Sequence, residues 1–219
     1  MSARRIVVGV NGSASSAAAA RWAAAEARRR GAALDIVVAH QGGIPGRAFP
    51  SRTDLPRTAD ERAAAIVDAA MEQARSGATV VPVRGEAVAG DPVPVLLEAA
   101  AGAELLVVGG RGHGDPGPML GVVTSQAAAY ALCSVAVVRP GGCNDTPDTV
   151  VVGLDDSPAT STTAGIAFEQ AALRPHGTLQ VVSAFTVPTG RDLRGIETER
   201  RRRLTDDLTP WQENSRTSR

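Results

Sequence analysis

The sequence predicts an α/β fold built on a doubly wound parallel sheet, and three observations favour it. Short apolar runs rich in valine alternate with longer alanine-rich runs along residues 1–140. Glycine-containing turns follow the first and the fourth of these apolar runs. After residue 149 the opening pattern of the chain begins again. Strands that alternate with helices form parallel pairs, so we expect a five-stranded sheet in the order 3-2-1-4-5, followed by a partial second copy.

Five strands are expected in the first 140 residues. Each is a run of consecutive apolar residues, which is typical of strands that helices cover on both faces. Pro82 lies within the third run and cannot donate to a sheet ladder, so we expect that strand at an edge of the sheet. The predicted strands cover residues 5–10, 34–40, 79–84, 105–108 and 135–139.

Four helices connect these strands. Ser13 is a suitable N-cap for the first helix, and Gly31 after three arginines is a typical helix end. Asp91 is expected to cap the third helix, with Pro92 at its first position. Between the second strand and the second helix, residues 41–57 lack periodicity and predict a long surface loop. The predicted helices cover residues 14–30, 58–76, 92–101 and 122–132.

Two separate segments are expected to meet at a ligand site. The turn at Asn11 follows the first strand, and the glycine-rich segment 109–121 follows the fourth. Ligands of doubly wound sheets bind where the strand order reverses, which here lies between these two strands. A glycine-rich turn that enters a helix presents backbone N–H groups at a positive helix end, which suits a phosphate. A glycine-rich connection that binds nothing is the alternative, and glycine content alone leaves it open.

The composition excludes several classes of function. The formal net charge is zero, so the sequence implies no nucleic-acid partner and no anionic membrane surface. All 23 basic residues are arginine, so a Walker A lysine and a Schiff-base lysine are both missing. Cys133 and Cys143 form no CxxC motif, and we predict no metal site.

Neither a membrane segment nor a catalytic constellation is evident. No apolar run approaches the length of a membrane span and the chain opens without an apolar leader core, so we expect a cytoplasmic location. Ser13 has no evident general base, and the histidines at 40, 113 and 176 lie far apart in the sequence. We therefore predict no catalytic residues.

An internal repeat divides the chain. Residues 150–157, VVVGLDDS, repeat residues 6–13, IVVGVNGS. We expect a complete domain over residues 1–140, a linker over 141–149, and a truncated second copy over 150–219 that holds strand, helix, strand and helix. The second copy includes four consecutive arginines at 200–203, but nearby Glu and Asp residues neutralise them, so we expect a solvated helix face.

These motifs together resemble a tandem universal stress protein whose second domain is truncated. The resemblance rests on the two VVG openings, the GDP segment at 90–92 and the GGRGHG segment at 109–114. The family's phosphate loop runs G-x-x-G, nine residues, then G-[S/T]; here eight residues separate Gly112 from Gly121. The resemblance implies a Rossmann-like fold of the adenine nucleotide alpha hydrolase type. It also implies a stress-response protein that binds ATP, with or without Mg²⁺, as a regulatory ligand, with at most weak ATP hydrolysis.

The resemblance also assigns residues to the nucleotide site by position. Two residues after the first strand would approach the adenosine, and the backbone of one residue in the second strand would hold the adenine edge. The remaining residues would form the two parts of the phosphate loop. The residues are Val10 and Asn11, then Ala39, then Val108, Gly109, Arg111 and Gly112, and finally Gly121, Val122, Val123 and Thr124.

This sequence departs from the family pattern at three points. Asn11 stands where the family usually has Asp, the loop is one residue short, and Val122 stands where the family has a hydroxyl residue. Thr124 matches a later hydroxyl position of the same turn. The alternative is therefore a ligand-free, degenerate member that acts through dimerisation or partner binding. In both cases the resemblance implies a homodimer through the fifth strand, Val135–Arg139.

Overall fold

The computed structural model describes residues 4–41, 58–75, 81–110, 120–139, 149–155, 157–186 and 193–217. The chain divides into two compact units, Met1–Asp145 and Thr146–Arg219. Each unit is described by itself below. In the described residues no helix has the length and apolar character needed to cross a membrane.

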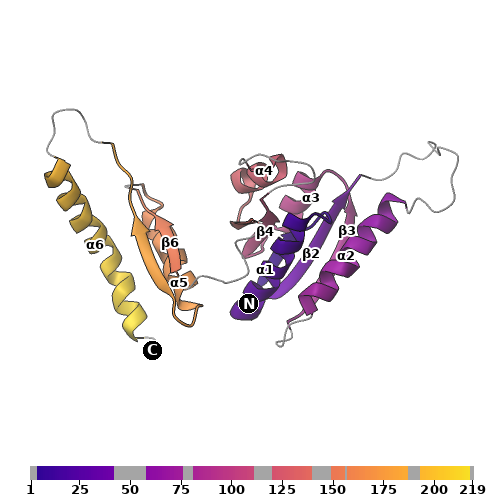
Figure 1. The fold of residues 1–219 in the computed structure, drawn as a ribbon, viewed down its shortest axis with the longest axis horizontal. Helices are drawn as coiled ribbons and strands as arrows, with labels where there is room; N and C mark the ends of the chain where they lie inside the picture. Colours follow the sequence, from indigo (N-terminus) through magenta and orange to yellow (C-terminus); the bar gives the residue numbers. More distant parts are fainter. Residues whose placement is uncertain are drawn as a thin grey trace. The chain divides into compact units, whose positions relative to one another are not determined.

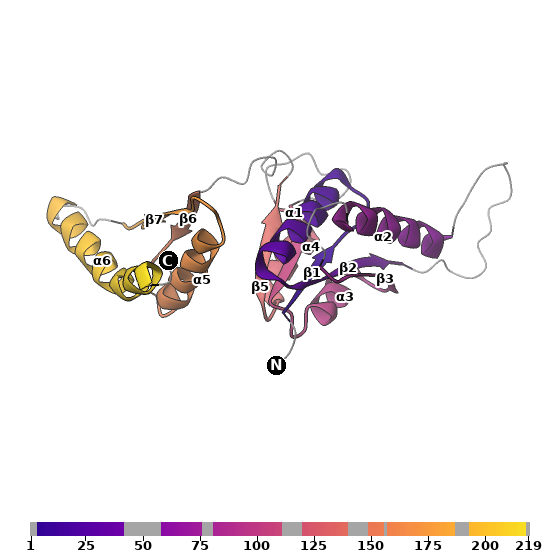
Figure 2. The same cartoon turned by 90° about the horizontal axis from the view of Figure 1, so that it is seen from below.

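The first unit is a five-stranded parallel sheet covered by helices on both faces. The strand order is β3-β2-β1-β4-β5, which confirms the predicted topology. Helices α1 and α2 lie on one face and α3 and α4 on the other (Figures 1 and 2). The elements are β1 (Arg5–Gly9), α1 (Ala14–Arg30), β2 (Ala33–His40), α2 (Ala59–Arg75), β3 (Val83–Ala89), α3 (Pro92–Ala99), β4 (Leu105–Gly109), α4 (Val122–Tyr130) and β5 (Ser134–Val138).

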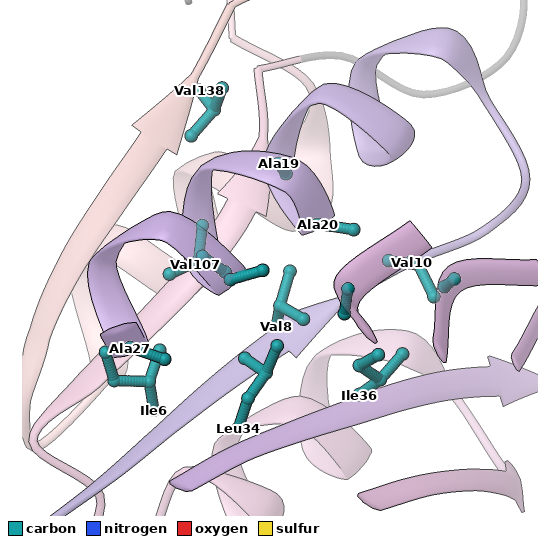
Figure 3. Close-up of a cluster of buried hydrophobic side chains, with 14 of the residues drawn as sticks. Ile6, Val8, Val10, Ala19, Ala20, Ala27, Leu34, Ile36, Val107 and Val138 are labelled. Carbon is teal, nitrogen blue, oxygen red and sulfur yellow. The ribbon is translucent and has the colours of Figure 1, made fainter. Parts of the chain in front are cut away.

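Both faces of the sheet are buried, as the consecutive apolar runs predicted. Ile6 and Val8 of β1 point toward α1, together with Leu34 of β2 (Figure 3). Val7 of β1 points to the opposite face, where it packs with Leu96 of α3. Most buried residues of α1 are alanines, which allow the helix to approach the strands closely.

The ends of the first helix and the beginning of the third agree with the sequence, except that the third lacks a side-chain capping bond. Ser16 N–H donates to the Ser13 hydroxyl at 3.1 Å, and Gly31 ends α1 in the left-handed conformation with φ of 60°. Asp91 is the N-cap residue of α3 and Pro92 follows it, as predicted, but the Asp91 side chain makes no capping hydrogen bond. Its carboxylate instead accepts from the Gln41 amide at 3.4 Å.

The third strand also differs from the prediction. It covers Val83–Ala89, whereas the sequence indicated residues 79–84. Pro82 precedes the strand, and its carbonyl oxygen accepts from Leu34 N–H at 2.8 Å. The strand lies at the edge of the sheet, as expected from the proline, but it is largely exposed and carries charged residues. The position of this strand therefore does not coincide with the run of apolar residues.

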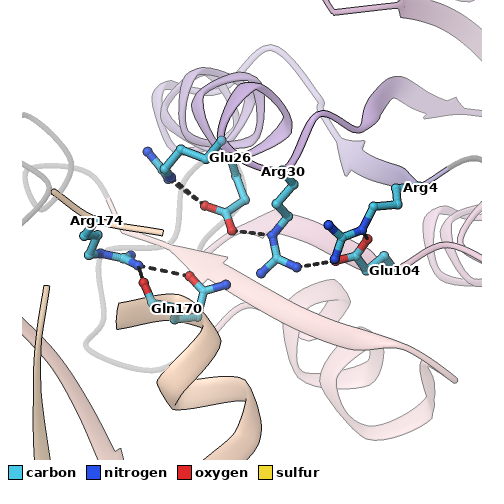
Figure 4. Close-up of polar contacts among 7 residues, drawn as sticks. Arg4, Glu26, Arg30, Glu104, Gln170 and Arg174 are labelled. Atoms are coloured by element: carbon cyan, nitrogen blue, oxygen red, sulfur yellow. Dashed lines mark hydrogen bonds and ion pairs between the residues drawn. The ribbon is translucent and has the colours of Figure 1, made fainter. Parts of the chain in front are cut away.

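A buried ion-pair network joins α1 to the beginning of β4 (Figure 4). The Glu26 side chain is completely buried and accepts from Arg29 at 2.6 Å and from Arg30. Arg30 also pairs with Glu104, which accepts from Arg4 at 3.0 Å. Burial lowers the pKa of the Arg30 guanidinium, but the hydrogen bonds and charges of Glu26 and Glu104 outweigh it, so the net shift is upward.

The second unit contains one parallel strand pair and two helices. The elements are β6 (Thr149–Gly153), α5 (Thr160–Ala172), β7 (Thr178–Val182) and α6 (Leu193–Thr217). Thr149, which we expected in the linker, is the first residue of β6. The four arginines at 200–203 of α6 are exposed or half-buried, and those at 201–203 pair with Glu197, Glu199 and Asp206, as predicted for a solvated face.

The two units share local geometry at matching positions. Val10 N–H donates to Val37 O at 2.9 Å, and Leu154 N–H donates to Val182 O at 2.9 Å. The units differ on the other face of the sheet, because Val151 of β6 is 60% exposed. The shared geometry supports the interpretation of residues 150–219 as a partial second copy.

Candidate functional site

A cavity of about 260 Å³ opens at the carboxyl ends of β1, β2 and β4. Helix α3 forms one wall, and the first turn of α4 forms another. The cavity lies where the strand order reverses, which is the expected ligand position in a doubly wound sheet. It is lined by Gly9, Val10, Asn11, Ser16, Val37, Ala39, Pro92, Leu96, Val108, Gly109, Gly121, Val122, Val123 and Thr124.

The structure brings the predicted site residues together. Each one that it describes lines this cavity: Val10, Asn11, Ala39, Val108, Gly109, Gly121, Val122, Val123 and Thr124. The other two, Arg111 and Gly112, lie outside the described residues, as does the loop histidine at 113.

Ala39 presents unpaired backbone groups to the cavity. Residues of a strand between two parallel neighbours bond alternately to each side. Val37 accepts from Val10 on the β1 side, whereas His40 accepts from Gly90 on the β3 side, so Ala39 faces β1. Strand β1 ends at Gly9, and the described residues supply no partner for the N–H and C=O of Ala39 on this side. One donor and one acceptor therefore stand side by side at the cavity.

The side chain of Asn11 closes a tight turn at the end of β1. Its Oδ1 accepts from Ser13 N–H at 3.1 Å. The Asn11 N–H donates to the Ser16 hydroxyl at 3.3 Å, and that hydroxyl donates to Ser13 O at 2.9 Å. The Ser16 hydroxyl is thus occupied by the turn. The amide group of Asn11, with two N–H donors, is the part of this turn that remains for a ligand.

A hydrogen bond joins the two ends of the glycine-rich segment, and another attaches its first end to β5. Gly110 N–H donates to Val138 O at 2.8 Å, and Gly121 N–H donates to Gly110 O at 3.0 Å. The segment therefore begins and ends at the same edge of the cavity. At Gly109 a Cβ atom would lie 2.9 Å from the backbone of Ser15, so only glycine allows α1 and β4 to approach this closely.

Thr124 and Val122, which both lie in the first turn of α4, have different roles. The Thr124 hydroxyl is buried and donates to Gly109 O at 2.7 Å, so it holds α4 against β4. The resemblance places Thr124 in the second part of the phosphate loop, and in the structure its hydroxyl has a positioning role. Val122 lies at the first position of α4, lines the cavity and is 74% exposed.

The first turn of α4 supplies backbone N–H donors, and neither its N-cap residue nor an acidic side chain of that turn binds them. Gly121 is the N-cap and provides no side-chain bond, and the first turn contains no acidic residue. Backbone N–H groups in the first turn of a helix lack intrahelical partners and carry a partial positive charge. Among the described lining residues none is charged, so an anion here would be bound by backbone donors.

Sequence reasoning missed the apolar wall of the cavity. Pro92 and Leu96 of α3 lie against the ends of β1 and β2, and Leu96 is buried. Gly9 permits this packing, because a Cβ atom there would lie 2.8 Å from the Leu96 side chain. The GDP segment before α3 is the available signal; it predicts a helix start and contributes to the family resemblance, but neither use assigns α3 to the cavity.

The described residues contain no group of three or more metal-binding side chains. None of the described residues that line the cavity is a carboxylate.

The chain is similar to known proteins in both sequence and structure. The model of the universal stress protein family matches residues 2–139. A universal stress protein of Mycobacterium tuberculosis is 30% identical over 224 residues, which cover 95% of this chain and 75% of that protein. The structure of the universal stress protein UspA from Lactobacillus plantarum is 23% identical, with a TM-score of 0.51, and the match covers 62% of this chain and 97% of that chain.

A crystal structure of a universal stress protein in complex with cAMP is also similar. It is 28% identical, with a TM-score of 0.47, and covers 64% of this chain and 98% of that chain. The family model spans more than half of the chain, and the mycobacterial relative extends the match into the second unit. The chain therefore belongs to the universal stress protein family.

Proposed function

We propose that the cavity of the first unit binds an adenine nucleotide as a regulatory ligand. The proposal rests on one observation: backbone groups without a partner among the described residues lie at both ends of the cavity. Ala39 offers one N–H and one C=O, which match the acceptor and donor on the Watson–Crick edge of adenine. At the other end, the first turn of α4 offers backbone donors for a phosphate.

The strand order supports the same arrangement. Strand β1 lies between β2, which carries Ala39, and β4, which leads to α4. Adjacent strands lie about 4.8 Å apart, so the two ends of the cavity are separated by roughly 10 Å. A nucleoside with its first phosphate fits this span, and its sugar would lie over Asn11. Val10 and Val108 would contact the nucleoside from the sheet side.

We infer that ATP is the physiological form and that the protein acts by binding and not by rapid turnover. The hydroxyls of Ser16 and Thr124 donate to backbone carbonyls, and the described lining includes no acid or base to activate water. At most weak hydrolysis is expected. Magnesium would enter with the phosphates of ATP.

The quaternary proposal is a homodimer through β5. This strand lies at the edge of the sheet, and its side chains are half-buried or exposed except for Val138. An edge strand without charged residues or proline, as in Ser134–Val138, readily pairs with another chain. A cytoplasmic location is part of this proposal and can be tested by cell fractionation.

Calorimetric titration of the full chain with ATP tests the nucleotide proposal. Binding in the micromolar to millimolar range is expected, together with release of adenine nucleotide when freshly purified protein is denatured. The alternative, a ligand-free member that acts through dimerisation, predicts no heat of binding at millimolar ATP and no released nucleotide. The shortened loop and Val122 are the features that favour this alternative.

A further inference from the structure

The orientation of the Asn11 amide bears on which nucleotide the cavity prefers. A backbone N–H can bond only to the oxygen of an amide, and Ser13 N–H approaches Asn11 Oδ1 at 3.1 Å. This bond fixes which end of the amide is used by the turn. The NH₂ group is left for the cavity, so position 11 offers donors to a ligand.

At the corresponding position of the second unit an acid makes the same side-chain bond. Asp155 accepts from Ser157 N–H at 3.0 Å, as Asn11 accepts from Ser13. Hydrogen bonds from the Ser157 side chain and, secondly, from its backbone N–H lower the pKa of the Asp155 carboxyl. An aspartate in this turn presents a negatively charged acceptor, whereas Asn11 presents a neutral donor. Both side chains accept from the backbone N–H two residues later, and they differ in what they offer to a ligand.

The surroundings of Asn11 also favour a negative group. Asn11 is exposed at the mouth of the cavity, so there is room for a substituent on the sugar. Helix α1 begins directly after the turn, and its first turn contains no acidic residue. Because no described lining residue is charged, nothing there repels an anion. The positive end of α1 adds a favourable field at this position.

We propose that Asn11 selects adenine nucleotides that carry a phosphate on the ribose 3′ oxygen over those with a free ribose diol. This inference rests on the proposed function, since it assumes that the sugar lies over β1 between Ala39 and α4. The Asn11 amide would donate to the 3′-phosphate, while the first turn of α4 would hold the 5′-phosphate. Asn11 acts here as a specificity-determining residue.

The test compares two ligands on the full chain by titration calorimetry. The probes are AMP and adenosine 3′,5′-bisphosphate, with ADP as a ligand that adds charge at the 5′ end only. The wild type should bind the bisphosphate more tightly than AMP. In Asn11→Asp the dissociation constant of the bisphosphate, divided by that of AMP, should rise by about tenfold or more. The reason is that a carboxylate repels the 3′-phosphate and a hydrogen bond to charge is lost. The ratio of ADP to AMP should change much less.

Asp155→Asn is the matched control, because it makes the opposite change in the corresponding turn and should leave both ratios unaltered. Asn11→Asp is expected to fold, since Asp155 already makes this turn. Preference of the wild type for AMP, or an unchanged ratio in Asn11→Asp, would overturn the inference while leaving nucleotide binding intact. Absence of binding by all three ligands would instead overturn the proposed function and the inference with it.

Discussion

Thr124 donates its hydroxyl to the carbonyl oxygen of Gly109 at 2.7 Å and thereby joins the first turn of α4 to the end of β4. Removing the hydroxyl in Thr124→Val leaves this carbonyl without its partner. We expect a loss of about 1–3 kcal/mol in the free energy of unfolding and weaker nucleotide binding, because the α4 donors are no longer held in place. Urea unfolding and calorimetry measure the two effects. Thr124→Ser keeps the hydroxyl and should restore both; failure of that rescue would argue against the positioning role.

Val122 is the exposed residue at the N-terminus of α4, where the family has a hydroxyl. Val122→Ser should tighten ATP binding by about fivefold, because a new hydrogen bond contributes about 1 kcal/mol. Stability should hardly change, since the side chain is largely in solvent. Tyr130→Ser, at the other end of the same helix, is the control and should not affect affinity. Equal affinities of wild type and Val122→Ser would mean that residue 122 does not reach the phosphates.

Arg5 connects the beginning of β1 to the end of α3. Its guanidinium donates to Asp35 at 3.0 Å and to the carbonyl oxygens of Ala99 at 3.0 Å and Ala101 at 2.7 Å. Arg5→Leu should lower the free energy of unfolding by about 2 kcal/mol, because several acceptors lose their partner together. Arg5→Lys should rescue only part of this loss, since an ammonium cannot reproduce the planar fork.

The control for Arg5 is its neighbour Arg4. Arg4 pairs with Glu104 near the surface, with 54% of its side chain exposed. Surface ion pairs contribute little, so Arg4→Leu should change the stability by less than about 1 kcal/mol. Equal losses in the two variants would show that Arg5 is not the residue that holds α3.

Glu26 is a buried carboxylate between Arg29 and Arg30. Glu26→Gln should lower the free energy of unfolding by about 3 kcal/mol, because Arg30, whose side chain is 7% exposed, loses a buried partner. The matched control is Glu199→Gln on α6, where the partners Arg202 and Arg203 are exposed. That control should leave the melting temperature nearly unchanged. A small effect at Glu26 would mean that Glu104 alone satisfies Arg30.

The dimer proposal is tested on β5 by two proline substitutions. Val138 O accepts from Gly110 on the β4 side, so by alternation the N–H of Val137 faces the free edge and that of Ala136 faces β4. Val137→Pro should convert a dimer into a folded monomer, measured by light scattering, because it removes only an outward donor. Ala136→Pro should instead destabilise the fold. A wild type that is monomeric, or a dimer that survives Val137→Pro, would contradict pairing through this edge.

Local patterns in the sequence predicted most of the first unit. Consecutive apolar residues, the Ser13 cap and the Gly31 helix end are signals that neighbouring residues carry by themselves, and each corresponds to an observed feature. The third strand was placed wrongly because its position depends on distant partners. Gly85 of β3 packs against Met71 and Val67 of α2, and no pattern within residues 79–89 encodes that contact.

The sequence by itself determined where the cavity lies, because the strand order follows from the alternation of strands and helices and the motifs mark the strand ends. Only the tertiary structure decided that Pro92 and Leu96 form a wall of the cavity, and which atoms of the lining residues are available. Thr124 uses its hydroxyl on Gly109, and Asn11 uses its oxygen on Ser13, whereas the Ala39 backbone has no partner on the β1 side among the described residues, because β1 ends before reaching it. A hydrogen-bonding group is available only if no neighbour satisfies it, and in the cavity those neighbours are set by the packing of β1, β4 and α4.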